Sequence, residues 1–590
     1  MTNIDSHSFA QPQNVVVKHL QLDLTVDFKT KQLVGFAELT IENLTQANEL
    51  HLDSRDLKIE TVKLDDGTIS TFEIMPEVPF LGSEIIIKIK PSTKKVKISY
   101  STSPQAAAVQ WLDPEQTAGG KNPFLFTQSQ AILARTWIPL QDSPGIRFTY
   151  EATIHCPPNL MALMSAENDT TLHADGIYHF KMPQAIPSYL MALAVGDLKF
   201  HLYDNRSGVF AEPVTLEKAS YEFVDMPKMI AAAEELYGPY AWGRFDVLVL
   251  PPSFPFGGME NPRLTFSTPT IIAGDRSLVS LIAHELAHSW SGNLVTNATW
   301  DDFWLNEGFT VYFETRIMEK LYGKPYADML TVLNKGELDK TIIDLGKDNP
   351  DTNLYLNLKG RDADDGMNLI AYEKGRFFLT TIEFAVGRER WDEFINKYFE
   401  AHKFQSITTK VFLTYLNNEL IKGDTSLENK IRINDWVYNS GLPDNCPIIT
   451  STELEKAGKM ANDFKSGTSA NKLDTKNWTT HHWLYFLREL PASMNNTMMM
   501  DLDTTFHLTT SGNAEILFEW LLQSIHSSYE PANSSLEHFL TTVGRRKFVK
   551  PLYAALAETA NGKNKAREIY KKARQGYHSV TVATIDELLK

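Results

Sequence analysis

The sequence predicts a multidomain α+β protein, with an antiparallel β domain first and mostly helical domains after it. The chain has 590 residues, more than a single hydrophobic core organises, so several domains are expected. Strand-like alternation fills the first third of the chain, and helical patterns dominate the rest. A composition of 43% hydrophobic and 22% charged residues is typical of a globular protein with large cores.

The N-terminal β domain is expected to span residues 1–198. From Leu20 to Phe28 apolar residues alternate with polar ones, which is typical of a half-buried strand. The segments Ile85–Ile89 and Val96–Tyr100 are similar short strands, separated by a Pro-Ser-Thr turn. Consecutive short strands joined by turns favour an antiparallel arrangement.

Residues 199–441 are expected to form a second, mostly helical domain. A strand-like run, Phe245–Leu250, comes first, and helical patterns follow it. Three helices are expected to carry the chemistry: one contains His284, a second contains Glu307, and a third begins near Tyr372.

The sequence predicts a linker over residues 442–456 and a C-terminal α-helical domain over residues 457–590. Turn-forming residues cluster from Gly441 to Pro447, where the periodicity breaks down. From about Thr452 onward helical periodicity returns without strands.

A candidate metal site stands at the end of the segment Ile282–His288. His284 and His288 are four residues apart and project from the same face of a helix, so both can bind one ion. Glu307 follows nineteen residues after His288 and can return on a second helix as the third ligand. Two imidazoles, a carboxylate and an open position for water are typical of a catalytic zinc site, so one Zn²⁺ per chain is predicted. Glu285 is placed to take a proton from the metal's water.

The alternative interpretation is that the two histidines lie on an amphipathic helix and bind no metal. The preceding run Leu278–Ala283 is apolar, and polar groups at the end of such a run need a partner. A zinc ion supplies that partner, and Glu307 completes the ligands, so the metal site is favoured.

Four further motifs accompany the zinc motif, and their order matters more than any one of them. They are Thr127–Ala131, Gly257–Asn261, Ala371–Gly375 and Gly544–Phe548. With these motifs the chain resembles the gluzincin zinc aminopeptidases (aminopeptidase N-like), and in particular their leukotriene A4 hydrolase/aminopeptidase branch. The likeness covers most of the chain and implies a thermolysin-like fold for the catalytic domain.

The resemblance implies a zinc-dependent aminopeptidase that hydrolyses the N-terminal residue from short peptides with metal-activated water. Glu285 would be the general base and later the proton donor to the leaving amine. Tyr372 matches the family's tyrosine that donates to the oxyanion, since a phenol donates a hydrogen bond yet stays neutral at pH 7. Without the resemblance, an ordinary buried tyrosine would be the favoured interpretation.

The resemblance also implies how the substrate's free amine is bound. Glu260 matches the carboxylate that pairs with the ammonium group and so fixes the distance of the first peptide bond from the metal. Gly257 and Gly258 let the backbone approach the substrate closely, and Met259 belongs to the same binding segment. Gln130 matches a glutamine that binds the substrate's amine together with this carboxylate. The alternative interpretation of Gln130 is an ordinary surface amide.

Arg545 and Lys547 match the basic pair that captures a carboxylate in the leukotriene hydrolase branch. This role would favour short peptides with a free C-terminus, because the far end of the substrate is then anchored. The alternative is a solvated basic face, which the adjacent Arg546 makes reasonable.

Two further acids have weaker support. Asp364 stands where the epoxide-hydrolase members carry an aspartate needed for adding water to the lipid, and a simple polar turn is its equal alternative. Glu314 follows Glu307 on the same predicted helix, and we expect it to hydrogen-bond a zinc-ligating histidine.

Three departures from the branch's pattern bear on the substrate. Phe256 and Met367 replace tyrosines near the active site, and Phe309 replaces a histidine. All three are expected to make the pocket more apolar, with Phe256 and Met367 lining the space for the first side chain. They argue against lipid-epoxide hydrolysis as the main activity.

Composition limits the partners and the compartment. A net charge of −16 argues against nucleic acid and anionic membranes. Only two cysteines are present, so a disulfide framework is excluded and a reducing compartment fits. The N-terminal segment lacks the features of a signal peptide, and no window is long and apolar enough to span a membrane. We therefore predict a cytoplasmic, monomeric enzyme whose partners are short peptides.

Three alternative functions stay open. The first is a bifunctional epoxide hydrolase of the leukotriene A4 hydrolase type, and the second is an endopeptidase, which Glu260 and Gln130 oppose. The third is a non-catalytic, zinc-stabilised binding module, which needs neither the general base Glu285 nor the oxyanion donor Tyr372.

Overall fold

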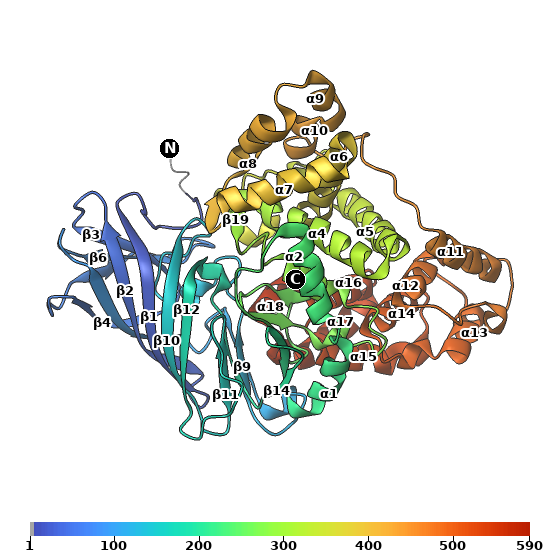
Figure 1. The fold of residues 1–590 in the computed structure, drawn as a ribbon. Coiled ribbons are helices and arrows are strands. Elements are labelled where there is room, and N and C mark those ends of the chain that lie inside the picture. Colours follow the sequence, from blue (N-terminus) through green and yellow to red (C-terminus); the bar gives the residue numbers. More distant parts are fainter. Residues whose placement is uncertain (1–4) are drawn as a thin grey trace.

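The computed structural model describes residues 5–590, and its fold has the three predicted parts (Figure 1). A β domain in blue lies on one side, and helices in orange and red lie on the other. The green and yellow helices of the catalytic part lie between and above them. The prediction that no signal peptide is present concerns the N-terminal segment. Residues 1–4 of that segment lie outside the described residues.

The largest sheet of the β domain has six strands in the order β12-β10-β1-β2-β7-β4. Its strands are β1 (Val15–Asp27), β2 (Gln32–Asn43), β4 (Lys58–Leu64), β7 (Lys95–Ser101), β10 (Arg147–His155) and β12 (Ile177–Pro187). The predicted alternation from Leu20 is confirmed, since Leu20, Leu22 and Leu24 are all buried on one face. The sheet is not purely antiparallel as predicted, because β1 and β10 pair in parallel. The long connection between them makes a parallel pair possible.

Two smaller sheets complete the β domain. One contains β3 (Glu49–Ser54), β5 (Phe72–Ile74) and β6 (Ser83–Lys88), and the other contains β8 (Val109–Leu112), β9 (Phe124–Thr127), β11 (Met161–Met164) and β13 (Leu193–Gly196). The predicted strands Ile85–Ile89 and Val96–Tyr100 correspond to β6 and β7. Strand β9 ends three residues before Gln130 and so carries that residue to the catalytic part.

The catalytic part begins with a five-stranded sheet in the order β14-β15-β16-β18-β17. Its strands are β14 (Lys199–Leu202), β15 (Ser207–Ala211), β16 (Phe245–Val249), β17 (Gly258–Met259) and β18 (Leu264–Ser267). The sequence predicted only the strand that corresponds to β16. The other four were missed because β14, β17 and β18 have only two to four residues, and because β15 begins with Ser207 and Gly208 and so lacks a continuous apolar run. The predicted boundary at residue 198 falls between the last strand of the β domain and β14.

Helices make up the rest of the catalytic part. They are α1 (Pro213–Glu222), α2 (Met226–Tyr237), α3 (Ser280–Ala287), α4 (Trp304–Tyr322), α5 (Lys324–Leu345), α6 (Gly375–Val386), α7 (Arg388–His402), α8 (Thr409–Leu416), α9 (Thr425–Ile431) and α10 (Ile433–Val437), with short strands β19 (Val295–Asn297) and β20 (Gln405–Ile407). Helix α4 is buried on all sides in its first half. Gly308 of α4 touches Gly375 of α6, since a Cβ on Gly308 would lie 2.8 Å from the Gly375 Cα. This close approach brings the turn before α6, with Tyr372, beside the turn of α4 that carries Glu307.

The C-terminal part is helical, as predicted. Its helices are α11 (Thr452–Lys465), α12 (Thr480–Glu489), α13 (Asn496–Phe506), α14 (Ala514–His526), α15 (Asn533–Thr542), α16 (Arg546–Ala557), α17 (Ala560–Ala573) and α18 (Ser579–Leu588). Helix α11 begins inside the predicted linker 442–456, because the Ser451 side chain caps it by accepting from Leu454 N. Ser579 Oγ donates to Ala107 O at 2.6 Å and Arg546 N donates to Pro255 O at 2.8 Å. These contacts fix the helical part against both other parts.

Across residues 5–590, every helix is too short or too polar to cross a lipid bilayer.

Candidate active site

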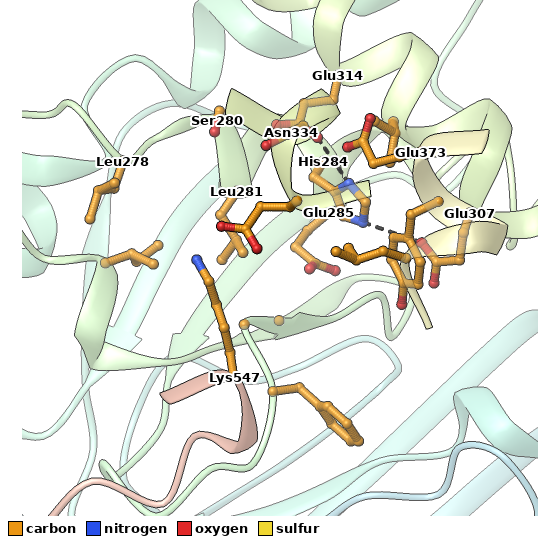
Figure 2. Close-up of a pocket in the computed structure, with 18 of the residues that line it drawn as sticks. Leu278, Ser280, Leu281, His284, Glu285, Glu307, Glu314, Asn334, Glu373 and Lys547 are labelled. Atoms are coloured by element: carbon orange, nitrogen blue, oxygen red, sulfur yellow. Dashed lines mark hydrogen bonds and ion pairs between the residues drawn. The ribbon is translucent and has the colours of Figure 1, made fainter. Parts of the chain in front are cut away.

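A groove of about 540 Å³ lies between the catalytic helices and the C-terminal helices. Its walls come from α3, α4 and α5, from the segment 255–260, and from α12, α14 and the start of α16. Figure 2 shows His284, Glu285 and Glu307 on one side of this groove and Lys547 on another. The predicted metal site and the predicted basic pair therefore share one cavity.

His284, His288 and Glu307 meet in a tight cluster. His284 Nε2 and His288 Nε2 are 3.2 Å apart, and Glu307 Oε2 lies 3.4 Å and 3.5 Å from them. Ligands about 2.0–2.1 Å from a tetrahedral zinc ion are separated by roughly these distances. The buried Glu307 Oε2 accepts no hydrogen bond from any of residues 5–590, so a cation would satisfy it. The donor atoms and their spacing fit zinc.

Hydrogen bonds orient both imidazoles so that Nε2 faces the other ligands. His284 Nδ1 lies 3.1 Å from Glu314 Oε2, the contact drawn in Figure 2. His288 Nδ1 lies 3.0 Å from Ser291 O and 3.1 Å from Thr310 Oγ1. When each Nδ1 donates to its oxygen, each Nε2 keeps its lone pair for a metal ion. Glu314 thus occupies the position that the sequence analysis expected.

Glu285 is buried beside the metal ligands. Burial raises the pKa of Glu285 well above its ordinary value, and the carboxylates of Glu260, Glu307 and Glu314 add to that rise. Gly258 of β17 passes directly over this side chain, since a Cβ on Gly258 would lie 2.1 Å from Glu285 Oε1. A residue larger than glycine would displace the carboxyl group, so the glycine is needed for the site's shape.

Tyr372 lines the groove in a turn of π-helix, Ile370–Lys374, directly before α6. Its ring stacks on that of His284, with centroids 6.2 Å apart and planes 13° apart. Burial, and then the carboxylates of Glu307 and Glu260, raise the pKa of Tyr372 well above its ordinary value. The phenol is therefore a neutral hydrogen-bond donor beside the metal ligands.

Glu260 is 4% exposed and is held by two amide groups. Gln130 Nε2 and Asn306 Nδ2 each donate to Glu260 Oε1 at 3.3 Å. Burial raises the pKa of Glu260, and these donors oppose that shift. Asn306 Nδ2 also contacts the hydroxyl of Tyr189 at 3.3 Å, so Glu260 is part of a buried polar network next to the metal ligands.

Arg545 and Lys547 line the groove beyond Glu285, and both pair with one acid. Lys547 Nζ is 2.8 Å from both oxygens of Glu515, and Arg545 Nη1 is 3.3 Å from Oε1. Gly257 makes room for the guanidinium, since a Cβ there would lie 2.9 Å from Arg545 Nη2. The alternative of a wholly solvated basic face does not hold for Arg545, which is 6% exposed.

Three expectations differ from the structure. The Met259 side chain is not among the groove-lining residues, because the period of two in β17 directs it to Gln128, whose Nε2 is 3.2 Å from its sulfur. Phe309 lies in the core against Phe412 rather than in the pocket. Asp364 lies in a 3-10 turn, Ala363–Gly366, outside the lining of the groove. Phe256 and Met367 do line it, as expected.

The sequence analysis missed two residues of the site. Asn306 has a visible signal, because an amide directly before the predicted metal ligand Glu307 and within a buried helix needs polar partners. Glu515 has no such signal: it lies thirty residues before Arg545 among ordinary helical residues. Only the packing of α14 on α16 brings them together.

Three family models match the chain in the order of its domains. The peptidase M1 N-terminal domain matches residues 16–190, the peptidase family M1 domain matches residues 221–435, and the leukotriene A4 hydrolase C-terminal domain matches residues 478–589.

Several known proteins are similar over nearly their whole length. A leukotriene A-4 hydrolase of Xenopus laevis is 37% identical and covers 98% of both chains. A leucine aminopeptidase 2 of Yarrowia lipolytica is 35% identical over 98% of this chain and 92% of its own. The structure of a yeast LTA4 hydrolase in complex with bestatin superposes with a TM-score of 0.93, at 30% identity, covering 100% of this chain and 98% of that one.

Proposed function

This chain belongs to peptidase family M1 as a zinc-dependent aminopeptidase, and we propose that its groove removes the N-terminal residue from short peptides. The observation that carries the proposal is the closeness of a buried carboxylate to the metal ligands. Oxygen and nitrogen atoms of Glu260, Glu285 and His288 lie within 4.8 Å of one another. An ammonium group paired with Glu260 therefore leaves room for one residue before the metal, which is the geometry of an exopeptidase.

His284, His288 and Glu307 are the proposed zinc ligands. Zinc, when bound there, acts as a Lewis acid that polarises the attacking water and the scissile carbonyl. Glu285 would take the proton of that water and pass it to the leaving amine. Tyr372 donates its hydroxyl hydrogen to the carbonyl oxygen as negative charge develops there.

Gln130 and Glu260 are the proposed amine anchor, and Arg545 and Lys547 are the proposed carboxylate anchor. The first pair holds the substrate's N-terminus near the metal ligands, and the second pair holds its C-terminus further along the groove. A substrate held at both ends has a restricted length, which is why short peptides are proposed.

Hydrolysis of leucine anilide beside its N-acetylated form, with and without a zinc chelator, tests the proposal. We expect cleavage of the free-amine substrate alone, and loss of that cleavage when the chelator is present. Equal cleavage of both substrates would contradict the amine anchor. Activity that resists the chelator would contradict the metal mechanism.

A second candidate activity is hydrolysis of a lipid epoxide. Its support is the 37% identity with a leukotriene A-4 hydrolase over 98% of the chain. Phe256 and Met367, which line the groove, argue against it as the main activity. Incubation with leukotriene A4 and chromatography of the products would show a new diol if this activity exists.

We propose that the enzyme acts as a monomer in the cytoplasm. One chain supplies every residue of the proposed site, so no partner subunit is needed to complete it. Cys156 and Cys446 are free thiols, which suits a reducing compartment. Light scattering should give a mass near 66.8 kDa, and a dimer mass would contradict the first part.

A further inference from the structure

The two cations of the proposed carboxylate anchor share a buried acid, Glu515 of α14. Glu515 is 4% exposed, and both of its oxygens accept from Lys547 Nζ at 2.8 Å. Arg545 Nη1 donates to Glu515 Oε1 at 3.3 Å and to Thr270 Oγ1 at 3.1 Å. The anchor therefore carries one net positive charge instead of two, before any substrate arrives.

Both cations keep donor capacity that Glu515 does not use. Lys547 Nζ carries three N–H groups, and Glu515 offers two oxygens to them. Arg545 Nη2 lies toward Gly257, on the segment that leads to Glu260. A peptide carboxylate in the groove can accept from these groups while Glu515 stays in place. Two carboxylates then share two cations.

The surroundings hold Glu515 charged and fixed. Burial by itself would raise the pKa of Glu515, but Lys547 and Arg545 outweigh burial and lower it. Arg488, which pairs with Glu519 one turn later on α14, acts in the same direction. Arg545 is 6% exposed, whereas the Lys547 side chain is 49% exposed. Lys547 is thus the partner that can turn from Glu515 to a substrate.

We propose that Glu515 is a positioning residue that sets the strength of the carboxylate anchor: it holds Arg545 and Lys547 in place and competes with the substrate's carboxylate for them. The inference rests on the proposed role of this basic pair. Repulsion between the two carboxylates weakens the hold on the peptide and lets the product leave. Without Glu515 the buried Arg545 lacks its counter-charge, and an external anion gains affinity.

The test compares tri-alanine with its C-terminal amide in the wild-type enzyme and in Glu515→Gln. The two substrates differ only in the carboxylate that the anchor is proposed to bind. In Glu515→Gln we expect the KM for the free acid to fall about tenfold relative to the KM for the amide, with a smaller change in kcat. Acetate should also inhibit this variant at about tenfold lower concentration than it inhibits the wild type.

A matched control is Glu519→Gln, which removes a partly buried acid one turn further along α14 that pairs with Arg488 and not with the basic pair. It should leave the ratio of the two KM values as it is in the wild type. If Glu515→Gln lowers or does not change the preference for the free acid, Glu515 is only a structural partner and the inference is wrong. If Glu515→Gln does not fold, Glu515→Asp is the second variant, because its side chain is one methylene shorter and its charge lies further from the basic pair. It should also lower the KM for the free acid relative to the KM for the amide. A rise in the KM for the free acid would then overturn the inference.

The wild type separates this inference from the proposal on which it rests. A preference for tri-alanine over its amide that disappears in Lys547→Ala supports the anchor independently of Glu515. Without that preference, both the anchor and the role of Glu515 are wrong, while cleavage of leucine anilide would still support the aminopeptidase.

Discussion

The two ends of the groove are built in different ways. At the metal end, His284 lies in α3, His288 directly follows it and Glu307 lies in α4, and only sixteen residues separate the two helices. At the carboxylate end, Gly257, Glu515 and Arg545 come from segments nearly three hundred residues apart. The metal end has a visible sequence pattern, whereas the other end depends on the docking of the C-terminal helices.

The two ends also differ in how their charges are balanced. Glu307 Oε2 and Glu285 Oε2 are buried oxygens without a hydrogen bond from residues 5–590, so a cation would satisfy the metal end. At the other end Glu515 already balances one of the two cations. The first arrangement favours tight binding of an ion, and the second favours reversible binding of a substrate. The predictions below test this contrast.

The largest effect is expected at the metal end, from Glu285→Gln. The amide cannot take a proton from water, so kcat should fall about a thousandfold. Zinc content, measured by atomic absorption, should stay at one per chain because Glu285 is not among the proposed ligands. Loss of zinc would mean that Glu285 holds the metal, and unchanged kcat would exclude it as the base.

A smaller effect at the same end is expected from Glu314→Gln. The amide oxygen is a weaker acceptor than the carboxylate for the His284 Nδ1 hydrogen, so zinc affinity should fall about 10–100-fold. Activity measured against increasing chelator concentration gives this affinity. Thr315→Ala, on the next position of α4, is the matched control and should leave the affinity unchanged. Equal zinc affinities in Glu314→Gln and the wild type would show that Glu314 does not support metal binding.

At the carboxylate end, Lys547→Ala should raise the KM for tri-alanine about tenfold relative to the KM for leucine anilide. The reason is the loss of one charged donor to the substrate's carboxylate. Lys550→Ala, an exposed lysine on the same helix, controls for a general loss of positive charge. A proportional rise in both KM values would show that Lys547 affects the whole groove and not one end of it.

The smallest effect concerns the docking of the C-terminal helices, through His578. This buried side chain lies before α18, 3.5 Å from Ala108 O of the β domain, and burial lowers its pKa to about 4. Below about pH 6.5 the unfolded chain binds a proton at this histidine while the folded chain does not, so the free energy of unfolding falls as the pH falls toward 4. The loss between pH 7 and pH 5.5 should be about 1 kcal/mol.

Denaturant unfolding of the wild type and of His578→Asn at both pH values measures this contribution. The variant should lose about 1 kcal/mol less than the wild type between the two pH values. Equal losses would show that His578 does not contribute to the acid sensitivity. The carboxylate end depends on the docking of the C-terminal helices more than the metal end does. As the pH falls, the KM for tri-alanine should therefore change at a higher pH than kcat for leucine anilide does.

Local patterns predicted much of this molecule correctly. The alternation from Leu20 corresponds to a strand, and the i, i+4 histidines at the end of α3 face one point. The expected contact of Glu314 with a histidine of the proposed metal site, His284, is present as well. Each of these depends on the fixed period of a strand or helix, so residue spacing alone is enough.

Other features depend on contacts that spacing does not describe. The sequence by itself indicated the proposed metal ligands, the proposed general base and the order of the domains, because these follow from helix periodicity and from motifs in a fixed order. The tertiary structure alone decided that Met259 turns toward Gln128, that Phe309 belongs to the core, and that Glu515 balances Arg545. The physical reason is that direction and charge balance arise where separate elements pack, and packing joins residues far apart in the chain.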